Sequence, residues 1–272
     1  MIKLENVVLA SPEQMEFIIE GMRNPMNSWE KSDSYTGYDC KACGHIERDG
    51  ACIKGYPERE YCSDYYGFEL GKNDHSLMQR LADAGTDHRK FMRMMPVYVR
   101  ITAPLYWYKE FDTYKVGTVT NSCSTMHKIA EKEFTLDDFS CEHLLCGSVL
   151  DDVPNNDGKW VRFNGSDCLK DTIRMLNIAR GLYLQTKDKR FWWQMIQLLP
   201  SSYNQTRNIM MNYEVLANIY KSRRGHKLDE WRDLCEWIES LPYSELIMSA
   251  AGLDDNSINA RQGLTHQRDV LV

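Results

Sequence analysis

The sequence predicts a single α+β domain that spans residues 1–272 and is rich in helix in its C-terminal half. The first observation is a strand pattern, since Val97, Val99 and Ile101 alternate with more polar side chains. The second is the helical character of residues 167–248. The third is size, because 272 residues without an internal repeat or a linker-like boundary can bury a substantial core without disulfides.

The N-terminal part predicts a helix followed by a loop-rich insertion. Ser11 is a good N-cap, Pro12 suits the first turn, Gln14 stands at the capping-box position and Gly21 marks the end of the helix. Residues 27–73 are dense in Gly, Asp, Tyr and Cys and show no sustained period. This composition indicates a Cys-rich loop insertion.

Regular structure is expected to resume after the insertion. The stretch SLMQRLADAG is amphipathic and closes at Gly85, which favours a helix. Pro104 ends the strand that follows, and LYWYKEFDTYK then has a helical rhythm. Asn, Asp, Pro and Gly predict a loop at residues 151–167. Residues 167–248 predict three or four helices, one of which contains NYEVLANIYKSR at residues 212–223.

Composition excludes several classes of partner. The formal net charge is -6 and there is no long block of Lys and Arg, so we expect no nucleic-acid partner. Eighteen consecutive apolar residues occur nowhere, and the N-terminus lacks the pattern of a signal peptide. We therefore expect a soluble, cytoplasmic protein that makes no use of a membrane. Nine cysteines without a signal peptide are more typical of reduced thiols than of a disulfide framework.

Four cysteines of the insertion form a candidate metal site. Cys40 and Cys43 stand in a C-x2-C arrangement, with Cys52 and Cys62 behind them. Two-residue spacing lets two thiolates meet one tetrahedral zinc ion, although the second pair lacks that spacing. This spacing is compatible with a structural zinc site and also with four unligated thiols.

A second cluster lies at residues 121–127. Asn121, Ser122, Cys123, Ser124 and His127 fall within seven residues. A Cys/His nucleophile pair is one interpretation, and a small buried cysteine is the other. Because small hydroxyl and amide groups suit hydrogen bonding to a polar ligand, the cluster favours ligand binding over covalent catalysis.

The helix expected at residues 212–223 raises a question about buried polar groups. At 100° per residue its apolar side chains form one stripe, and Asn212 and Arg223 lie on that stripe, roughly 16 Å apart along the axis. The stripe consists of Val215, Leu216, Ile219 and Tyr220. An unpaired guanidinium there is costly, so Arg223 needs either a buried carboxylate or a bound ligand.

Several spacings resemble one family, the flavin-dependent thymidylate synthases. In that family a late helix carries Asn, a second Asn six residues on and Arg five further on, and Asn212, Asn218 and Arg223 keep these intervals. LPSSYNQTR is similar to the family's Leu-Pro segment, with Pro200 twelve residues before Asn212. His88 precedes the proline of an Ala-Pro pair by sixteen residues, also as in the family.

The family's arginine-rich signature is only partly matched. TYKVGTVTNSCSTMH, residues 113–127, aligns with it so that Tyr114 and Lys115 fall near its His-Arg and Asn121 and Ser124 near its Asn and second Ser. The closing arginine, which grips the substrate phosphate, becomes Met126 or His127 here. A second phosphate arginine, expected four residues before Pro200, is Ile196. The resemblance covers roughly residues 75–240 and excludes the Cys-rich insertion.

The resemblance implies a central sheet with long helices and a homotetramer that binds FAD. It implies one-carbon transfer to a pyrimidine nucleotide without a protein nucleophile, with NADPH and a folate as co-reactants. The expected FAD-binding residues are His88, Tyr114, Lys115, Asn212, Asn218 and Arg223. The expected substrate-binding residues are Asn121, Ser124, Arg207 and Arg223. The alternatives are a homologue that binds flavin or nucleotide without this activity, and an enzyme for a different nucleotide.

Overall fold

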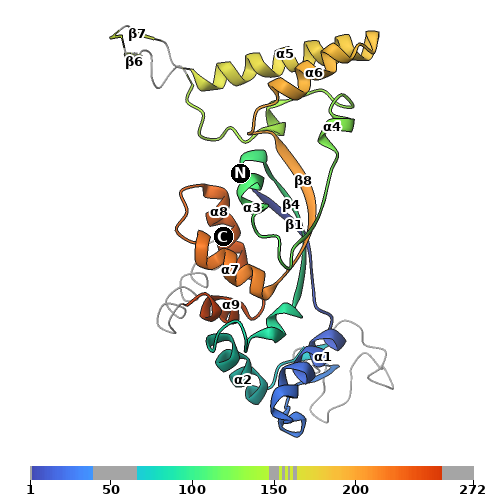
Figure 1. Cartoon of the computed structure of the whole chain (residues 1–272), viewed down its shortest axis with the longest axis vertical. Coiled ribbons are helices and arrows are strands. Elements are labelled where there is room, and N and C mark those ends of the chain that lie inside the picture. Colours follow the sequence, from blue (N-terminus) through green and yellow to red (C-terminus); the bar gives the residue numbers. More distant parts are fainter. Residues whose placement is uncertain are drawn as a thin grey trace, which may run out of the picture. The chain divides into compact units, whose positions relative to one another are not determined.

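The structure is a computed structural model of the whole chain (Figure 1). It describes residues 2–38, 66–146, 153–154, 157–158, 160–161 and 164–252. The four cysteines of the candidate zinc site lie outside these residues. The chain divides into two compact units. Unit 1 contains Met1–Asn6, Val99–Lys115 and Val119–Ile209, and unit 2 contains Val7–Tyr98, Val116–Thr118 and Met210–Val272.

A four-stranded sheet has the order β1-β4-β8-β5. Its strands are β1 (Lys3–Leu9), β4 (Pro96–Pro104), β8 (Asn204–Asn212) and β5 (Val119–Ser122). The chain divides within β1, β4 and β8, so each of them contributes residues to both units. Val97, Val99 and Ile101 of β4 are all buried, which confirms the predicted strand.

Strand β8 corrects the expectation that residues 167–248 contain only helices. Gln205, Ile209 and Met211 are buried, and Arg207 is largely covered, so every second side chain faces inward. Two of these four inward residues are polar, and the hydrophobic alternation that identifies a strand is therefore short. Sequence inspection missed β8 for this reason.

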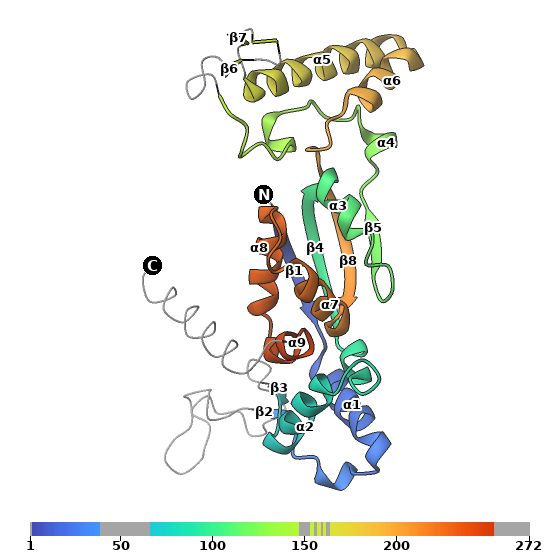
Figure 2. The ribbon, with the colours of Figure 1, turned by 60° about the vertical axis from the view of Figure 1, so that its left-hand side comes forward.

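In unit 1 a helical hairpin packs around its own core. It consists of α5 (Gly165–Thr186) and α6 (Lys189–Leu198), which lie side by side in both ribbon views (Figures 1 and 2). Asn164 caps α5 by accepting from the Asp167 backbone, and Lys187 ends it in the left-handed conformation. The buried core is Ile129, Phe134, Phe139, Leu169, Ile173, Leu176, Ala179 and Met195.

The remaining elements of unit 1 are short. As predicted, the LYWYKEF stretch forms a helix, α3 (Leu105–Phe111). The others are α4 (Thr125–Lys128), the 3-10 turn η6 (Leu136–Asp138), and the two-stranded pair β6 (Val153–Pro154) and β7 (Trp160–Val161). That pair lies in the segment for which the sequence predicted only a loop.

Unit 2 is mostly helical. The predicted first helix is confirmed as α1 (Pro12–Arg23), with the full capping box between Ser11 and Gln14. The other helices are α2 (Lys72–Asp83), α7 (Tyr213–Arg223), α8 (Asp229–Glu239) and α9 (Ser244–Ala250), with 3-10 turns η1 (Asn24–Met26), η2 (Trp29–Lys31) and η5 (Lys90–Arg93). Helices α7, α8 and α9 contact one another (Figure 2).

Two features of unit 2 differ from the prediction. Strands β2 (Tyr35–Tyr38) and β3 (Tyr66–Glu69) form an antiparallel pair inside the segment predicted as loop. Helix α2 also begins at Lys72, four residues before the stretch from which it was predicted. In the described part of the chain, no helix is both long and apolar enough to span a bilayer.

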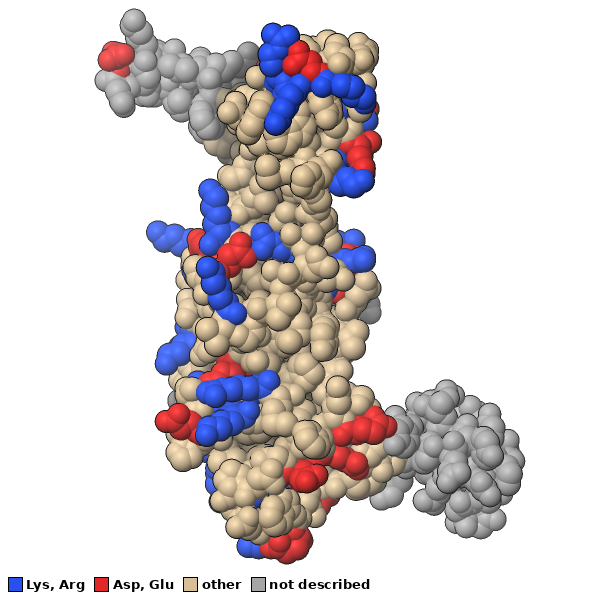
Figure 3. All heavy atoms as spheres, turned by 45° about the vertical axis from the view of Figure 1, so that its right-hand side comes forward, with Lys and Arg blue, Asp and Glu red and all other residues tan. Residues whose placement is uncertain are grey.

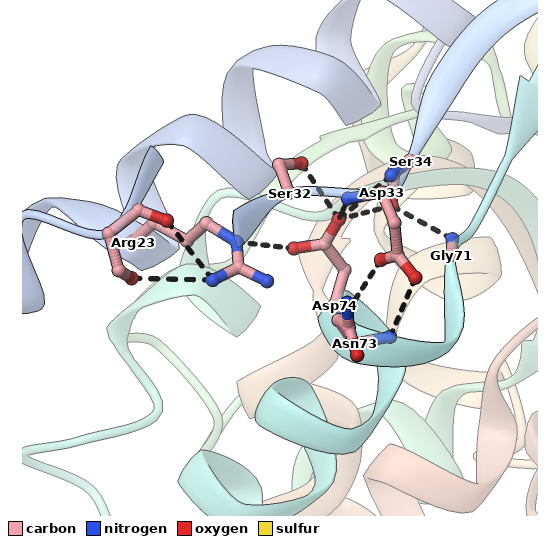
Figure 4. A network of polar contacts seen from close by, with 8 residues as sticks. Arg23, Ser32, Asp33, Ser34, Gly71, Asn73 and Asp74 are labelled. Carbon is pink, nitrogen blue, oxygen red and sulfur yellow. Dashed lines mark hydrogen bonds and ion pairs between the residues drawn. The ribbon is translucent and has the colours of Figure 1, made fainter. Parts of the chain in front are cut away.

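A buried carboxylate ties α1 and α2 to the segment between them (Figure 4). Asp74 Oδ1 pairs with Arg23 Nε at 2.5 Å. Asp74 Oδ2 accepts from the hydroxyls of Ser32 and Ser34 at 2.8 and 2.6 Å, and from the backbone N–H groups of Asp33 and Ser34 at 3.1 and 3.0 Å. Burial raises the pKa of Asp74, but these hydrogen bonds from serine, Arg23 and backbone outweigh burial and hold the pKa below its usual range.

The same network caps α2. The Asp33 carboxylate accepts from the backbone N–H groups of Asn73 and Asp74 at 2.9 and 3.1 Å, at the first turn of the helix. Gly71 precedes that turn, and a Cβ there would lie 2.1 Å from Asp33 Oδ1. Residue 71 must therefore be glycine for the capping carboxylate to approach.

Asp74→Asn should lower the free energy of unfolding by about 3 to 5 kcal/mol, because it leaves the Arg23 guanidinium buried without its charge partner. Urea denaturation measures this change, and Asp87→Asn, at an exposed aspartate of the same unit, is the control. Since the folded-state pKa of Asp74 is lowered, its contribution is present above the unfolded pKa and is lost as the pH falls through the folded pKa. Equal stabilities of the two variants would contradict this role.

Candidate functional site

The transition from β8 to α7 is organised by Asn212. This residue is the N-cap of α7, and its Oδ1 accepts from the Val215 backbone N–H at 3.0 Å. Its amide nitrogen has no hydrogen-bond acceptor among the described residues. Asn212 is half-buried rather than part of the buried stripe, which corrects the prediction that it lies on the apolar face of the helix. The four apolar residues of that stripe are buried as predicted.

A glycine turn packs against this cap. Gly117 has φ +79, and a Cβ added to it would lie 3.0 Å from both Asn212 Nδ2 and Val215 Cγ2. The hydroxyl of the next residue, Thr118, is buried and has no hydrogen-bond partner in the described structure. We call the turn Val116–Thr118, together with Asn212 and Val215, the α7 N-terminal site. It presents an amide donor and a glycine-lined approach at the positive end of an eleven-residue helix.

The first turn of α7 is fixed by charged groups that sequence analysis did not identify. The buried Glu214 carboxylate contacts Arg89 Nε at 3.4 Å and Arg93 Nε at 2.7 Å. Arg89 also donates to the Ala250 carbonyl at 2.7 Å and to the Thr86 hydroxyl at 3.3 Å. Because these partners are far apart in the chain, no local motif signals the cluster.

The other expected FAD-binding residues of unit 2 lie on α7 or in the segment before β4 that contacts its first turn. His88 is exposed, and it directly precedes Arg89, which holds the first turn of α7. Asn218 is exposed on α7. The Arg223 guanidinium lies over the Trp231 ring, 4.7 Å from its centroid, and the residue is half-buried. Arg223 is therefore only half-buried on the face that was expected to be buried, and an aromatic ring of α8 covers one side of its guanidinium.

Unit 1 holds the expected substrate residue Arg207 in a tight set of contacts. Its guanidinium stacks on the Tyr108 ring at 3.8 Å, and its Nη1 pairs with Asp112 Oδ1 at 2.6 Å. Its Nε donates to Gln205 Oε1 at 2.9 Å. Burial raises the pKa of Tyr108, whose hydroxyl donates to the Ile101 carbonyl at 2.8 Å. Arg207 is thus already engaged by three neighbours, and a phosphate would have to compete with Asp112.

Gln205 links Arg207 to the segment that contains Ser124. Its Nε2 donates to the Cys123 carbonyl at 3.3 Å and to the Thr125 hydroxyl at 2.9 Å. Ser124 itself caps α4 by accepting from the His127 backbone N–H at 3.3 Å. Gln205 therefore connects Arg207 to the two residues that flank Ser124, whereas the Ser124 hydroxyl bonds within its own turn.

The other predicted positions of unit 1 are more exposed. Asn121 lies on the edge strand β5, and all four side chains of that strand are exposed. Lys115 is exposed, whereas Tyr114 is half-buried with its ring tilted against Phe111 at a centroid distance of 6.5 Å. No described residue set supplies three or more grouped His, Cys, Asp or Glu side chains for a metal ion.

Two of the residues at the positions of the family's phosphate arginines, Met126 and Ile196, are apolar, and His127, the alternative to Met126, is exposed on α4. Ile196 packs against the core of the α5–α6 hairpin. Met126 is exposed, and its carbonyl accepts from the Trp192 indole N–H at 3.2 Å. Neither side chain supplies a hydrogen-bond donor for a phosphate.

Solved structures share this fold. Thymidylate Synthase X (ThyX) from Helicobacter pylori, with FAD and dUMP, matches with a TM-score of 0.55 and 14% identity, over 93% of this chain and 100% of that chain. A second structure of that flavin-dependent enzyme, complexed with FAD and dUMP, gives 0.53 and 15% over 92% and 98%. The UMP/dUMP methylase PolB from Streptomyces cacaoi, bound with 5-Br UMP, gives 0.49 and 13% over 92% and 93%.

The two Helicobacter structures show that the chain has the fold of the flavin-dependent thymidylate synthases. The predicted fold class and the predicted resemblance are confirmed at this level. No protein-family model and no curated protein matches the sequence.

Gly117→Ala should lower the free energy of unfolding by about 1 to 3 kcal/mol, because the positive φ and the two 3.0 Å approaches leave no room for a methyl group. Thermal or urea unfolding measures the loss. Gly181→Ala in α5 is the control, since nothing lies within 4 Å of its Cβ position. That variant should be neutral or more stable by up to about 1 kcal/mol. A Gly117→Ala protein as stable as the control would show that the turn does not pack on Asn212.

Proposed function

We propose that the protein is a divergent flavin-dependent enzyme that transfers a one-carbon unit to a pyrimidine nucleotide, and that FAD binds at the α7 N-terminal site. The observation that carries the proposal is the group of unused polar atoms there. The Thr118 hydroxyl is buried without a partner, and the Asn212 amide nitrogen is free beside the glycine approach. The Asn212 amide, which is not enclosed in this way, can donate to a planar heterocycle rich in hydrogen-bond acceptors. The fold and the sequence spacings support flavin as that heterocycle.

The residues of this site have separate roles in the proposal. Asn212 uses Oδ1 for the helix cap and donates from Nδ2 to the ligand. Gly117 keeps a side chain out of the approach, and the helix N-terminus favours electron-rich groups. Glu214, held by Arg89 and Arg93, keeps the first turn of α7 in position. The flavin, when bound, supplies the redox chemistry of the one-carbon transfer, for which NADPH and a folate are the co-reactants expected from the resemblance.

Purified protein should bind FAD, and Asn212→Asp should weaken binding by about tenfold, which corresponds to about 1.4 kcal/mol. Aspartate caps a helix about as well as asparagine but lacks the amide donor, so the free energy of unfolding should change by less than about 0.5 kcal/mol. Titration followed by flavin absorbance measures binding, and urea denaturation checks stability. The flavin assignment fails if folded wild-type protein takes up no FAD at high micromolar concentration.

The nucleotide is proposed to bind in unit 1 around Arg207 and Gln205, beside the segment that contains Ser124. Arg207 presents the guanidinium, and Asn121 and Ser124 offer amide and hydroxyl groups on and just after strand β5, which pairs with β8. The apolar residues Met126 and Ile196 leave the phosphate without the two arginines that the family uses. This observation favours a pyrimidine nucleotide that is recognised mainly through its base and sugar, with little affinity contributed by its phosphate.

Binding of deoxyuridine monophosphate should be weak. Two missing charge-assisted contacts, each worth about 1.5 to 3 kcal/mol, lower the affinity by two to four orders of magnitude. Calorimetric titration of FAD-loaded protein with deoxyuridine and with its monophosphate measures this effect, and the two ligands should bind within about tenfold of each other. Micromolar affinity for the monophosphate alone would contradict the proposed substrate class without affecting the flavin assignment.

An exposed apolar stripe on α5 supports the expected homotetramer. Met175 and Ile178 are each 49% exposed and Leu182 is 37% exposed, at the spacing of one helix face. The opposite stripe of α5 is already used by the hairpin core. An exposed apolar helix face of this length is typical of a protein–protein interface.

Light scattering should therefore give the mass of four chains for the wild type. Ile178→Asp should produce smaller species, because a charge in an apolar interface core is costly. Lys170→Asp adds an acid to the same helix outside the stripe and should leave the mass unchanged. A monomeric wild type at micromolar concentration would contradict the homotetramer.

A further inference from the structure

Unit 2 contains a polar cavity that the proposed flavin and nucleotide sites do not use. Its volume is about 400 Å³, and it opens along one face of α1. Glu16, Ile19, Glu20 and Arg23 recur at the three- and four-residue spacing of that face. Ser32, Ser34 and Trp29 also line it. The cavity therefore combines charged, hydroxyl and aromatic groups around one opening.

The deepest polar group of the cavity is only partly satisfied. Arg23 is 3% exposed. Its Nε pairs with Asp74, and its Nη1 donates to the backbone carbonyl and hydroxyl of Ser28 at 3.2 and 3.3 Å. Its Nη2 has no acceptor in the described parts of the chain, and Figure 4 shows this nitrogen without a contact. The chain does not fully enclose Nη2. This nitrogen is therefore accessible from the cavity that Arg23 lines. A ligand carbonyl would satisfy this donor.

The charge balance of the cavity is acidic. The Arg23 charge is neutralised by Asp74. No described residue forms an ion pair with Glu16 or Glu20 at the rim, although Glu16 Oε1 accepts from the Thr36 backbone N–H at 2.7 Å. Glu20 has no hydrogen-bond or ion-pair partner for its carboxylate among the residues that the structure describes. Figure 3 shows acidic side chains gathered over the lower part of the molecule, where Figure 1 places α1. Two like charges one turn apart on a helix destabilise it, so their placement at the rim is unfavourable unless a cation binds there.

An aromatic ring at the rim also favours a cation. Trp29 is 48% exposed, yet its indole N–H donates to Asn24 Oδ1 at 2.7 Å. This hydrogen bond fixes the ring while leaving much of it open. Tryptophan is the aromatic side chain that attracts cations most strongly.

We propose that this cavity binds a small organic cation that carries a carbonyl group, with its ammonium or guanidinium group at Glu16, Glu20 and Trp29 and its carbonyl on Arg23 Nη2. The acidic rim selects the cation, and the free Nη2 donor of Arg23 selects the acceptor. An anion is disfavoured because Asp74 already neutralises Arg23, the one cationic side chain among the described residues of the lining. The proposal stands independently of the flavin site.

Calorimetric titration of the full-length protein with L-argininamide tests it. The wild type should bind this probe, and agmatine, which lacks the carbonyl group, should bind about fivefold more weakly. Glu20→Gln and Glu16→Gln should each weaken argininamide binding by about three- to fivefold, because one partly exposed charge contact is lost. Trp29→Leu should weaken it by about two- to fivefold.

Matched controls separate this site from general charge attraction. Glu30→Gln removes the same charge from an exposed glutamate that does not line the cavity, and it should leave binding unchanged. FAD should neither compete with the probe nor alter its affinity. No heat of binding at millimolar argininamide, equal losses for Glu20→Gln and Glu30→Gln, or preferential binding of inorganic phosphate would each overturn the proposal. Circular dichroism confirms that the variants are folded.

Discussion

The positioning of the first turn of α7 is the constraint on which the candidate site depends. Asn212 caps the helix with one side-chain atom, and Gly117 approaches the other. Glu214 in the same turn is held by Arg89 and Arg93 from the segment before β4. The helix N-terminus is therefore fixed by a cap, a glycine turn and an ion cluster, while the Asn212 amide nitrogen is left for a ligand. A rigid helix end with one unused donor is the arrangement expected of a cofactor site.

The sequence predicted the elements whose signals are local. The capping box of α1, the alternation in β4 and the stripe of α7 depend on neighbouring residues, and all three are present. Strand β8 was missed because Gln205 and Arg207 occupy inward positions and interrupt the apolar alternation. Asn212 and Arg223 were placed on a buried face because helical periodicity does not distinguish a cap from the first helical residue, or an aromatic contact from full burial.

Two clusters of charged residues could not be predicted from the sequence. The Asp74 network joins residues about forty positions apart, and the Glu214 cluster joins residues more than a hundred positions apart. Spacing motifs identify only groups that are close in the chain, so neither cluster has a sequence signature. In unit 1, likewise, the sequence marked Arg207 as a candidate substrate-binding residue. The fold surrounds that guanidinium with Tyr108, Asp112 and Gln205, which makes it a less available donor.

The central claim is that flavin binds against the start of α7, and hydrogen exchange followed by mass spectrometry tests it most directly. Addition of FAD should slow exchange at the backbone amides of residues 116–118 and 213–216, because the ligand closes the glycine turn against the helix cap. Helices α5 and α6 of the same molecule provide internal references. Bound flavin, verified by absorbance, together with unchanged exchange in both segments would contradict the claim and place the cofactor elsewhere in the fold.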